Sequence, residues 1–161
     1  MSGIVGQGTK SGVIGDFFPT SIYVHGEGTN NFGVSGNRFG FSGTRRENKM
    51  VWSDSNTKIT PVFPGVYYIH VAANFANESP AATEDDSGNV LLKYNTSVLV
   101  AMSIHFHVTS SPTTAHEGVG NNLSYIHEIT GTPGYYSVEY SDYTGFGGYN
   151  EMVWIEIIKI K

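Results

Sequence analysis

The stretch FPGVYYIHVAANF, residues 63–75, decides the fold of this chain. Its Pro-Gly dipeptide is typical of a turn, and the residues that follow suit an extended strand. Side chains of a strand alternate between two faces, which separates Tyr67, Ile69, Val71 and Ala73 from Val66, Tyr68, His70 and Ala72. Neither set is plainly polar. We therefore expect this strand to lie between two layers, one being the core of its own domain and the other a neighbouring subunit.

Short apolar or aromatic runs continue along the whole chain, separated by residues that favour turns. No long segment has the 3.6-residue periodicity of a helix. The expected strands are residues 21–25, 38–42, 50–53, 58–62, 65–75, 90–94, 97–108, 123–129, 135–140 and 152–160. About ten short strands with little helix predict an all-β protein, a jelly-roll β-sandwich. A chain of 161 residues suits one such domain, which we place at residues 20–161 behind an N-terminal arm, residues 1–19.

The motif Phe63-Pro64-Gly65-Val66-Tyr67-Tyr68 resembles the C1q/TNF-like jelly-roll superfamily, in which Pro-Gly-x-Tyr-Tyr-Phe follows an aromatic residue on a central strand. Ile69 replaces the last aromatic residue. VLLKYNTSVLV (90–100) is similar to a strand pair of that family around a short Asn-containing turn. EMVWIEIIKIK (151–161) has the place of its closing strand, but FGGY (146–149) stands where Phe-Ser-Gly is usual. The resemblance implies a compact homotrimer, with Tyr67 and Ile69 in the domain core and Tyr68 and His70 toward the trimer seam.

The composition excludes several classes of protein. Only 14% of residues are charged, against roughly 25% in ordinary soluble domains. This low value suggests that part of the surface is buried against partners. Nine Lys and Arg residues against fourteen Asp and Glu leave a net charge of −5, which argues against nucleic-acid binding. The chain has no cysteine, no apolar run long enough for a membrane helix and no secretory signal pattern, so we expect no disulfide and no membrane insertion.

The N-terminal segment GIVGQGTKSGVIG (3–15) carries two apolar pairs, Ile4-Val5 and Val13-Ile14, between glycines. A phosphate-binding loop has the pattern G-x-x-x-x-G-K-[ST], but Thr9 stands at the lysine position and Lys10 comes one residue late. The segment is also too short to cross a membrane. We therefore predict an anchoring arm that attaches through its two apolar pairs.

Candidate chemistry in the sequence is sparse. His105 and His107 alternate along one strand and would bind zinc if a third ligand joined them, but a subunit contact or a plain surface position explains them better. TEDDSGN (83–89) lacks the spacing of a calcium loop and is expected to be a solvated turn. No nucleophile elbow and no convincing carboxylate pair are present. We expect no cofactor and no enzymatic activity.

Two long polar loops are expected, at residues 77–89 and 110–122, and a third aromatic-rich segment follows at 141–150. Tyr143, Phe146 and Tyr149 of that last segment are candidates for contact with a ligand, because aromatic rings beside polar loops suit sugar stacking or protein binding.

The missing cysteine and signal peptide, the low charge and the glycine-rich arm before a sandwich together predict a virion protein of a tailed bacteriophage. It would be a trimeric capsid decoration or fibre-type protein, assembled in the host cytoplasm, with itself and a capsid or tail protein as partners. An adhesin that binds a host receptor or surface glycan through residues 110–122 and 141–150 remains an alternative. A secreted bacterial C1q-like binding protein is a further one, although it would need a signal peptide.

Overall fold

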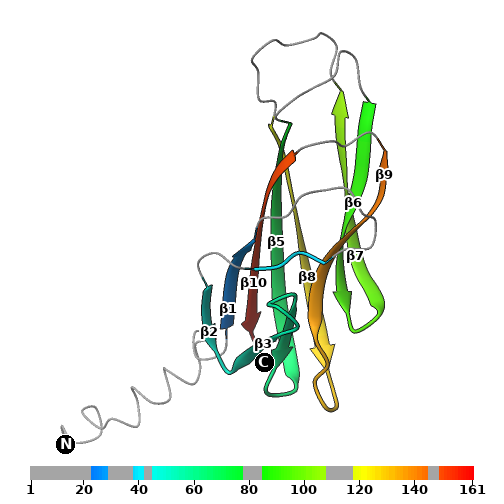
Figure 1. Ribbon diagram of the computed structural model, residues 1–161. Coiled ribbons are helices and arrows are strands. Elements are labelled where there is room, and N and C mark those ends of the chain that lie inside the picture. Colours follow the sequence, from blue (N-terminus) through cyan, green and yellow to red (C-terminus); the bar gives the residue numbers. More distant parts are fainter. Residues whose placement is uncertain (1–22, 29–37, 42–44, 78–84, 108–117, 145–148) are drawn as a thin grey trace, which may run out of the picture.

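In the computed structural model the protein is an all-β jelly-roll β-sandwich of two five-stranded antiparallel sheets (Figure 1). The structure describes residues 23–28, 38–41, 45–77, 85–107, 118–144 and 149–161, which include no helix. Sheet A has the strand order β2-β1-β10-β5-β8, and sheet B has the order β3-β4-β9-β6-β7. The strands are β1 (Tyr23–Gly28), β2 (Arg45–Asn48), β3 (Met50–Ser53), β4 (Lys58–Pro61), β5 (Gly65–Asn77), β6 (Asp85–Tyr94), β7 (Ser97–His107), β8 (Gly118–Ile129), β9 (Tyr136–Thr144) and β10 (Tyr149–Lys159).

The alternation predicted for residues 66–73 is confirmed in β5. Tyr67, Ile69, Val71 and Ala73 are buried between the sheets, whereas the side chains between them are half-exposed. β10 lies beside β5 and repeats the alternation, with Val153, Ile155 and Ile157 buried. Because directly paired residues of antiparallel strands share a face, the two strands present one continuous apolar surface to sheet B.

Sheet B supplies the other half of the core through β6 and β9. Val90 and Leu92 of β6 lie beside Tyr136, Val138 and Tyr140 of β9 on the inner side of this sheet. All five side chains are buried. The strand predicted at residues 38–42 is described over 38–41, where it forms only one bridge, between Arg38 and Glu139. These residues nevertheless bury Phe39 and Phe41 completely, and the Phe39 ring packs edge-on against Tyr140 with centroids 5.3 Å apart. β4 pairs with β9 only at Ile59 and Tyr136. The 38–41 segment bridges β9 further along, at Glu139.

Several strands are longer than the sequence predicted. β6 begins at Asp85, so Asp85 to Asn89 pair with β7 as a strand and the expectation of a turn at 83–89 was wrong for these residues. Likewise, residues 118–122 of the expected loop belong to β8 and pair with β5. In the expected 141–150 segment, residues 141–144 belong to β9 and 149–150 to β10. Polar side chains lowered the apparent strand propensity there, but pairing with a long neighbouring strand outweighs propensity.

The predicted turn within VLLKYNTSVLV is confirmed, since β6 and β7 form a hairpin around Asn95. Asn95 adopts a φ of 53°, a left-handed conformation that asparagine tolerates better than most residues. Its backbone N–H donates to the Tyr135 carbonyl oxygen (2.8 Å), and the Tyr135 N–H donates back to Asn95 Oδ1 (3.1 Å). These bonds tie the hairpin to the residues just before β9.

The arm predicted at residues 1–19 lies outside the described residues, and so do its contact residues Ile4, Val5, Val13 and Ile14. Phe146 and residues 110–117 are outside them as well. The domain boundary at residue 20 therefore stays a prediction.

Candidate functional site

The outward side of sheet A carries many apolar side chains in the described part of the chain. We call it the outer face of sheet A. Alternation from the buried residues assigns its members, which are Val66, Tyr68, His70 and Ala72 on β5, Asn122, Ser124, Ile126 and Glu128 on β8, and Trp154, Glu156 and Ile158 on β10. Six of these eleven side chains are aliphatic or aromatic, although a solvent-facing sheet normally alternates to polar residues on this side.

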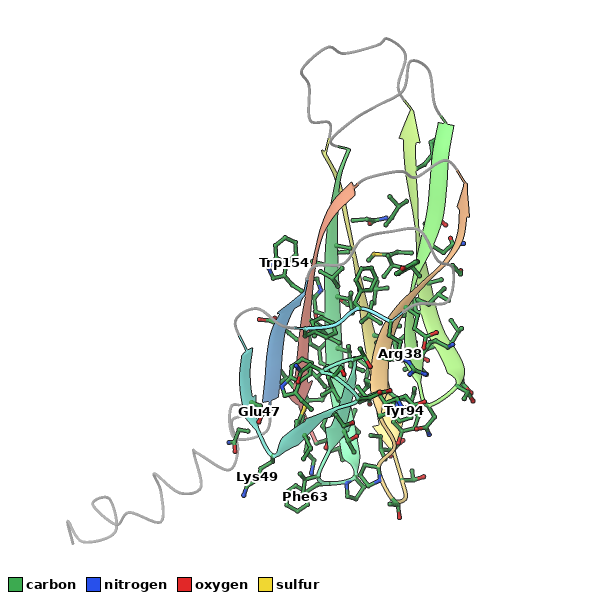
Figure 2. The ribbon with its side chains drawn as sticks, in the orientation of Figure 1. Arg38, Glu47, Lys49, Phe63, Tyr94 and Trp154 are labelled. Atoms are coloured by element: carbon green, nitrogen blue, oxygen red, sulfur yellow. The ribbon has the colours of Figure 1, made fainter. Side chains whose placement is uncertain are left out.

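One row of this face is apolar across three strands. Tyr68 is in register with Ile158 on one side and with Ile126 on the other. Ile126 is 62% exposed, the largest exposure among the large hydrophobic residues that the structure describes. Trp154 projects from β10 away from sheet B (Figure 2). Exposed contiguous apolar surface of this kind marks an interaction site in soluble proteins.

The neighbouring row of the same face is polar. His70 is in register with Glu156 on β10 and Ser124 on β8. The Ser124 hydroxyl lies 3.0 Å from His70 Nδ1 and 3.0 Å from the Tyr68 hydroxyl. This chain of three groups restrains the orientation of the imidazole, and because a serine hydroxyl can donate or accept, it suits either tautomer of His70. Tyr68 and His70, the predicted seam residues, thus meet through Ser124 on one face.

The outward side of sheet B has the opposite character. Glu139 of β9 is only 5% exposed, and its carboxylate accepts hydrogen bonds from Arg38 Nε (2.9 Å) and Lys93 Nζ (2.7 Å). Burial favours a raised pKa for Glu139, but these two cations outweigh burial and hold the pKa below its ordinary value. On this side of the sandwich the carboxylate of β9 is therefore satisfied by two cations, although Val51 and Val98 of the same sheet are exposed.

The β3–β4 turn extends these ion pairs. Asp54 lies 2.8 Å from Lys58 Nζ and 3.3 Å from an Arg38 guanidinium nitrogen, and the hydrogen bond from Lys58 lowers the pKa of Asp54. Lys58 Nζ also lies 4.7 Å from the centre of the Tyr135 ring, a cation–π distance. Sequence analysis did not anticipate this network, because its members are spread over four separate segments of the chain.

A cluster of aromatic rings and one histidine closes one end of the core. His127 Nδ1 lies 2.9 Å from the Tyr136 hydroxyl, and the His127 ring packs edge-on against Tyr94 at 4.5 Å. Burial raises the pKa of Tyr67 to about 12, with Tyr94 adding to the shift. Burial likewise raises the pKa of Tyr136 and lowers that of His127. Tyr67, Tyr136 and His127 are therefore held in their neutral forms at neutral pH.

The lowered pKa of His127 predicts acid sensitivity of the fold. The unfolded chain takes up a proton at His127 near the ordinary pKa of 6.5, whereas burial delays this in the folded state. His127 therefore costs the folded state nothing above pH 6.5. As the pH falls below 6.5, protonation of His127 favours the unfolded chain and lowers the free energy of unfolding. We expect the free energy of unfolding to fall between about pH 7.5 and 5.5, and to fall less steeply in a His127→Gln variant, as measured by urea denaturation at each pH.

The matched control for that experiment is Val98→Gln, which changes an exposed valine of β7 and removes no titratable group. It should keep the slope of the wild type. An unchanged pH slope in the His127→Gln variant would show that His127 is not the group responsible.

The remaining sequence candidates do not come together in the described residues. His105 and His107 both belong to β7, where His105 is exposed and the side chain of His107 is outside the description. Tyr143 lies in β9 and Tyr149 in β10, while Phe146 is not described. Within the described ranges, no three His, Cys, Asp or Glu side chains are placed to hold a metal ion. No described helix is long and apolar enough to span a membrane.

The strand order and the two antiparallel sheets define a jelly-roll β-sandwich fold. Among solved structures, the chain is similar to the globular domain of zebrafish complement 1qA protein, with a TM-score of 0.50 and 11% sequence identity. The similarity covers 88% of this chain and 98% of the zebrafish domain. At that identity it establishes the fold alone. No protein-family model matches this sequence, and no curated protein does.

Proposed function

We propose that this chain is a structural protein of a virion, a homotrimeric capsid decoration or fibre-type protein of a tailed bacteriophage. The observation that carries the proposal is the contrast between the two outward sheet faces. In sheet B the largely buried carboxylate of Glu139 is paired with Arg38 and Lys93, whereas sheet A places Tyr68, Ile126 and Ile158 in one outward row, of which Ile126 is 62% exposed.

A second and a third copy of the chain are the natural cover for the outer face of sheet A. A five-stranded sheet with an apolar outward side needs another layer, and self-association in soluble proteins usually closes with rotational symmetry. In such a trimer the polar row of His70, Ser124 and Glu156 is also removed from water. The Tyr68–Ser124–His70 contacts within each chain already satisfy part of its hydrogen-bonding requirement, which lowers the cost of that burial.

The proposed mechanism is adhesive rather than catalytic. A decoration protein stabilises a shell by bridging neighbouring subunits, and apolar burial supplies most of the free energy of such contacts. The low content of charged residues, 14%, supports a protein that buries much of its surface in contacts with other subunits. In this proposal residues 1–19 attach the trimer to a capsid or tail protein through Ile4-Val5 and Val13-Ile14.

Deletion of residues 2–15 tests the attachment. We expect the shortened protein to remain trimeric but to lose binding to empty phage shells, measured by co-sedimentation. A second variant of full length is Ile4→Ser/Val5→Ser/Val13→Ser/Ile14→Ser. It should lose binding as the deletion does, because it removes only the apolar pairs. Full shell binding by either variant would contradict the arm as anchor.

The adhesin alternative is separated by a glycan array. Binding to a defined sugar that depends on Tyr143 or Tyr149 would favour a receptor-binding role over decoration. Because Tyr143 lies on β9 and Tyr149 on β10, a sugar site there would be built on strands rather than on the loop that the sequence suggested.

A further inference from the structure

We propose that the end of the sandwich built from the β4–β5 connection and the last residues of the chain docks onto an anionic lipid surface. Apolar and basic residues lie beside one another there. This end, which we call the Phe63 patch, consists of Lys49, Val62, Phe63, Pro64, Lys159 and Lys161. Phe63 and Lys49 both lie at the lower end of the molecule in Figure 2.

Printed contacts join the members of the Phe63 patch. The Val62 N–H donates to the Lys49 carbonyl oxygen (3.0 Å), which sets the β4–β5 connection against the junction between β2 and β3. Lys159 Nζ lies 5.8 Å from the centre of the Phe63 ring. The Val66 N–H donates to the Lys161 carbonyl oxygen (2.8 Å), so the end of the chain is held beside the start of β5.

The apolar members of the patch are exposed although the connection itself is fixed. Val62 is 46% exposed and Phe63 is 43% exposed. The Phe63 carbonyl oxygen accepts a hydrogen bond from the buried Tyr67 hydroxyl, which anchors the backbone while the ring stays outside. A rigid connection with an apolar tip enters the boundary between headgroups and acyl chains at a low cost in conformational entropy.

The charge of the patch selects the kind of lipid. Lys49, Lys159 and Lys161 are three of only nine Lys and Arg residues in a chain of net charge −5. Lysine near an anionic bilayer adds attraction, and an aromatic residue among lysines is the usual composition of a surface-docking segment. Glu47 on β2 and Glu128 on β8, the latter in register with Val66, are the carboxylates close to these lysines and Phe63 along the sequence and register.

The shape of the patch favours a lipid surface over an acidic peptide. Peptides bind to sheet edges or grooves, and acidic motifs bind to arginine clusters, whereas the Phe63 patch as defined contains no arginine. Val62, Phe63 and Pro64 instead occupy the connection between two strands and are exposed together. In the proposed trimer, rotation about one axis would leave the three patches at the same height, so that one bilayer could meet all of them. Docking by a single chain does not require that trimer.

The test uses the full chain and vesicles of phosphatidylcholine with and without phosphatidylserine, in a co-sedimentation titration. We expect binding only to vesicles that contain phosphatidylserine, and weaker binding at high salt. The double variant Lys49→Gln/Lys161→Gln should bind roughly 25-fold more weakly, since each lysine near an anionic surface gives about five-fold. Lys49 has a φ of 58°, and glutamine meets the same backbone restriction as lysine there, so this change adds no new strain.

Two further variants and one control make the result specific. Phe63→Ser should weaken binding on the order of ten-fold, because about half of the ring still has to leave water. Glu47→Lys, next to the patch, should strengthen it by about five-fold. Val98→Ser removes an equally exposed valine of β7 and should bind as the wild type does.

Binding to phosphatidylserine vesicles that is absent, or that is the same in all these variants, overturns the proposal. Binding to a polyglutamate peptide without binding to vesicles would assign the patch to an acidic protein partner and would equally overturn the lipid assignment. Thermal melts of each variant confirm that the protein titrated is folded.

Discussion

An Ile126→Asp variant is expected to be a folded monomer. Ile126 is 62% exposed in the single chain, so a carboxylate there stays hydrated and costs the isolated domain little. In the proposed trimer the same position lies against another copy, where three equivalent carboxylates would be buried without partners. An unpaired buried charge costs about 3–5 kcal/mol, which corresponds to a loss of more than a hundred-fold in the association constant. Light scattering during size-exclusion chromatography measures the change in mass.

The matched control is Val51→Asp. Val51 on β3 is 52% exposed, a similar value, but it belongs to sheet B. This variant should keep the mass of the wild type. If both variants dissociate, or if neither does, the outer face of sheet A is not the seam.

Two neighbouring isoleucines of β10 should separate folding from assembly. Ile157 is fully buried in the core, whereas Ile158 lies half-exposed on the outer face of sheet A beside Tyr68. Ile157→Ala leaves a cavity between the sheets and should lower the free energy of unfolding by about 2–5 kcal/mol. Ile158→Ala should cost the isolated fold less than about 1 kcal/mol, because part of the side chain is already in water.

In trimer assembly the order of the two effects should be reversed, with Ile158→Ala the more damaging change. Ile158→Ala should raise the concentration at which trimers dissociate, whereas Ile157→Ala should shift urea denaturation at concentrations where the protein is monomeric. Urea titrations at low concentration and mass measurements over a dilution series give the two quantities. Equal effects of the two changes on unfolding would mean that β10 does not alternate between core and seam.

The sequence predicted the core of this fold because the decisive signal is local. Alternation in residues 65–75 assigned Tyr67 and Ile69 to the inside, and the structure buries both completely. The hairpin around Asn95 was equally visible, since an asparagine between two apolar runs marks a turn.

Features set by distant parts of the chain could not be predicted in the same way. β2 has the sequence RREN, and only its pairing with β1 makes it a strand. Asp85 and Asp86 look like turn residues until β7 is placed beside them. The ion pairs of Glu139 join Arg38 and Lys93, residues 101 and 46 positions away along the chain. Such contacts follow from strand order, which a single sequence does not contain.

The candidate assembly surface could be predicted from the sequence only in part. Tyr68 and His70 could be assigned to one face from alternation alone, but Ser124 could not be placed between them until β8 was known to pair with β5. Glu156 reaches the same row only because β10 pairs with the other side of β5.

The most direct test of the account is the mass of the wild-type protein in solution, measured by multi-angle light scattering over a wide range of concentrations at neutral pH. The proposed seam predicts a species of three times the chain mass of 17.5 kDa that persists on dilution. A single-chain mass at the highest concentration would contradict the trimer and, with it, the role assigned to the outer face of sheet A.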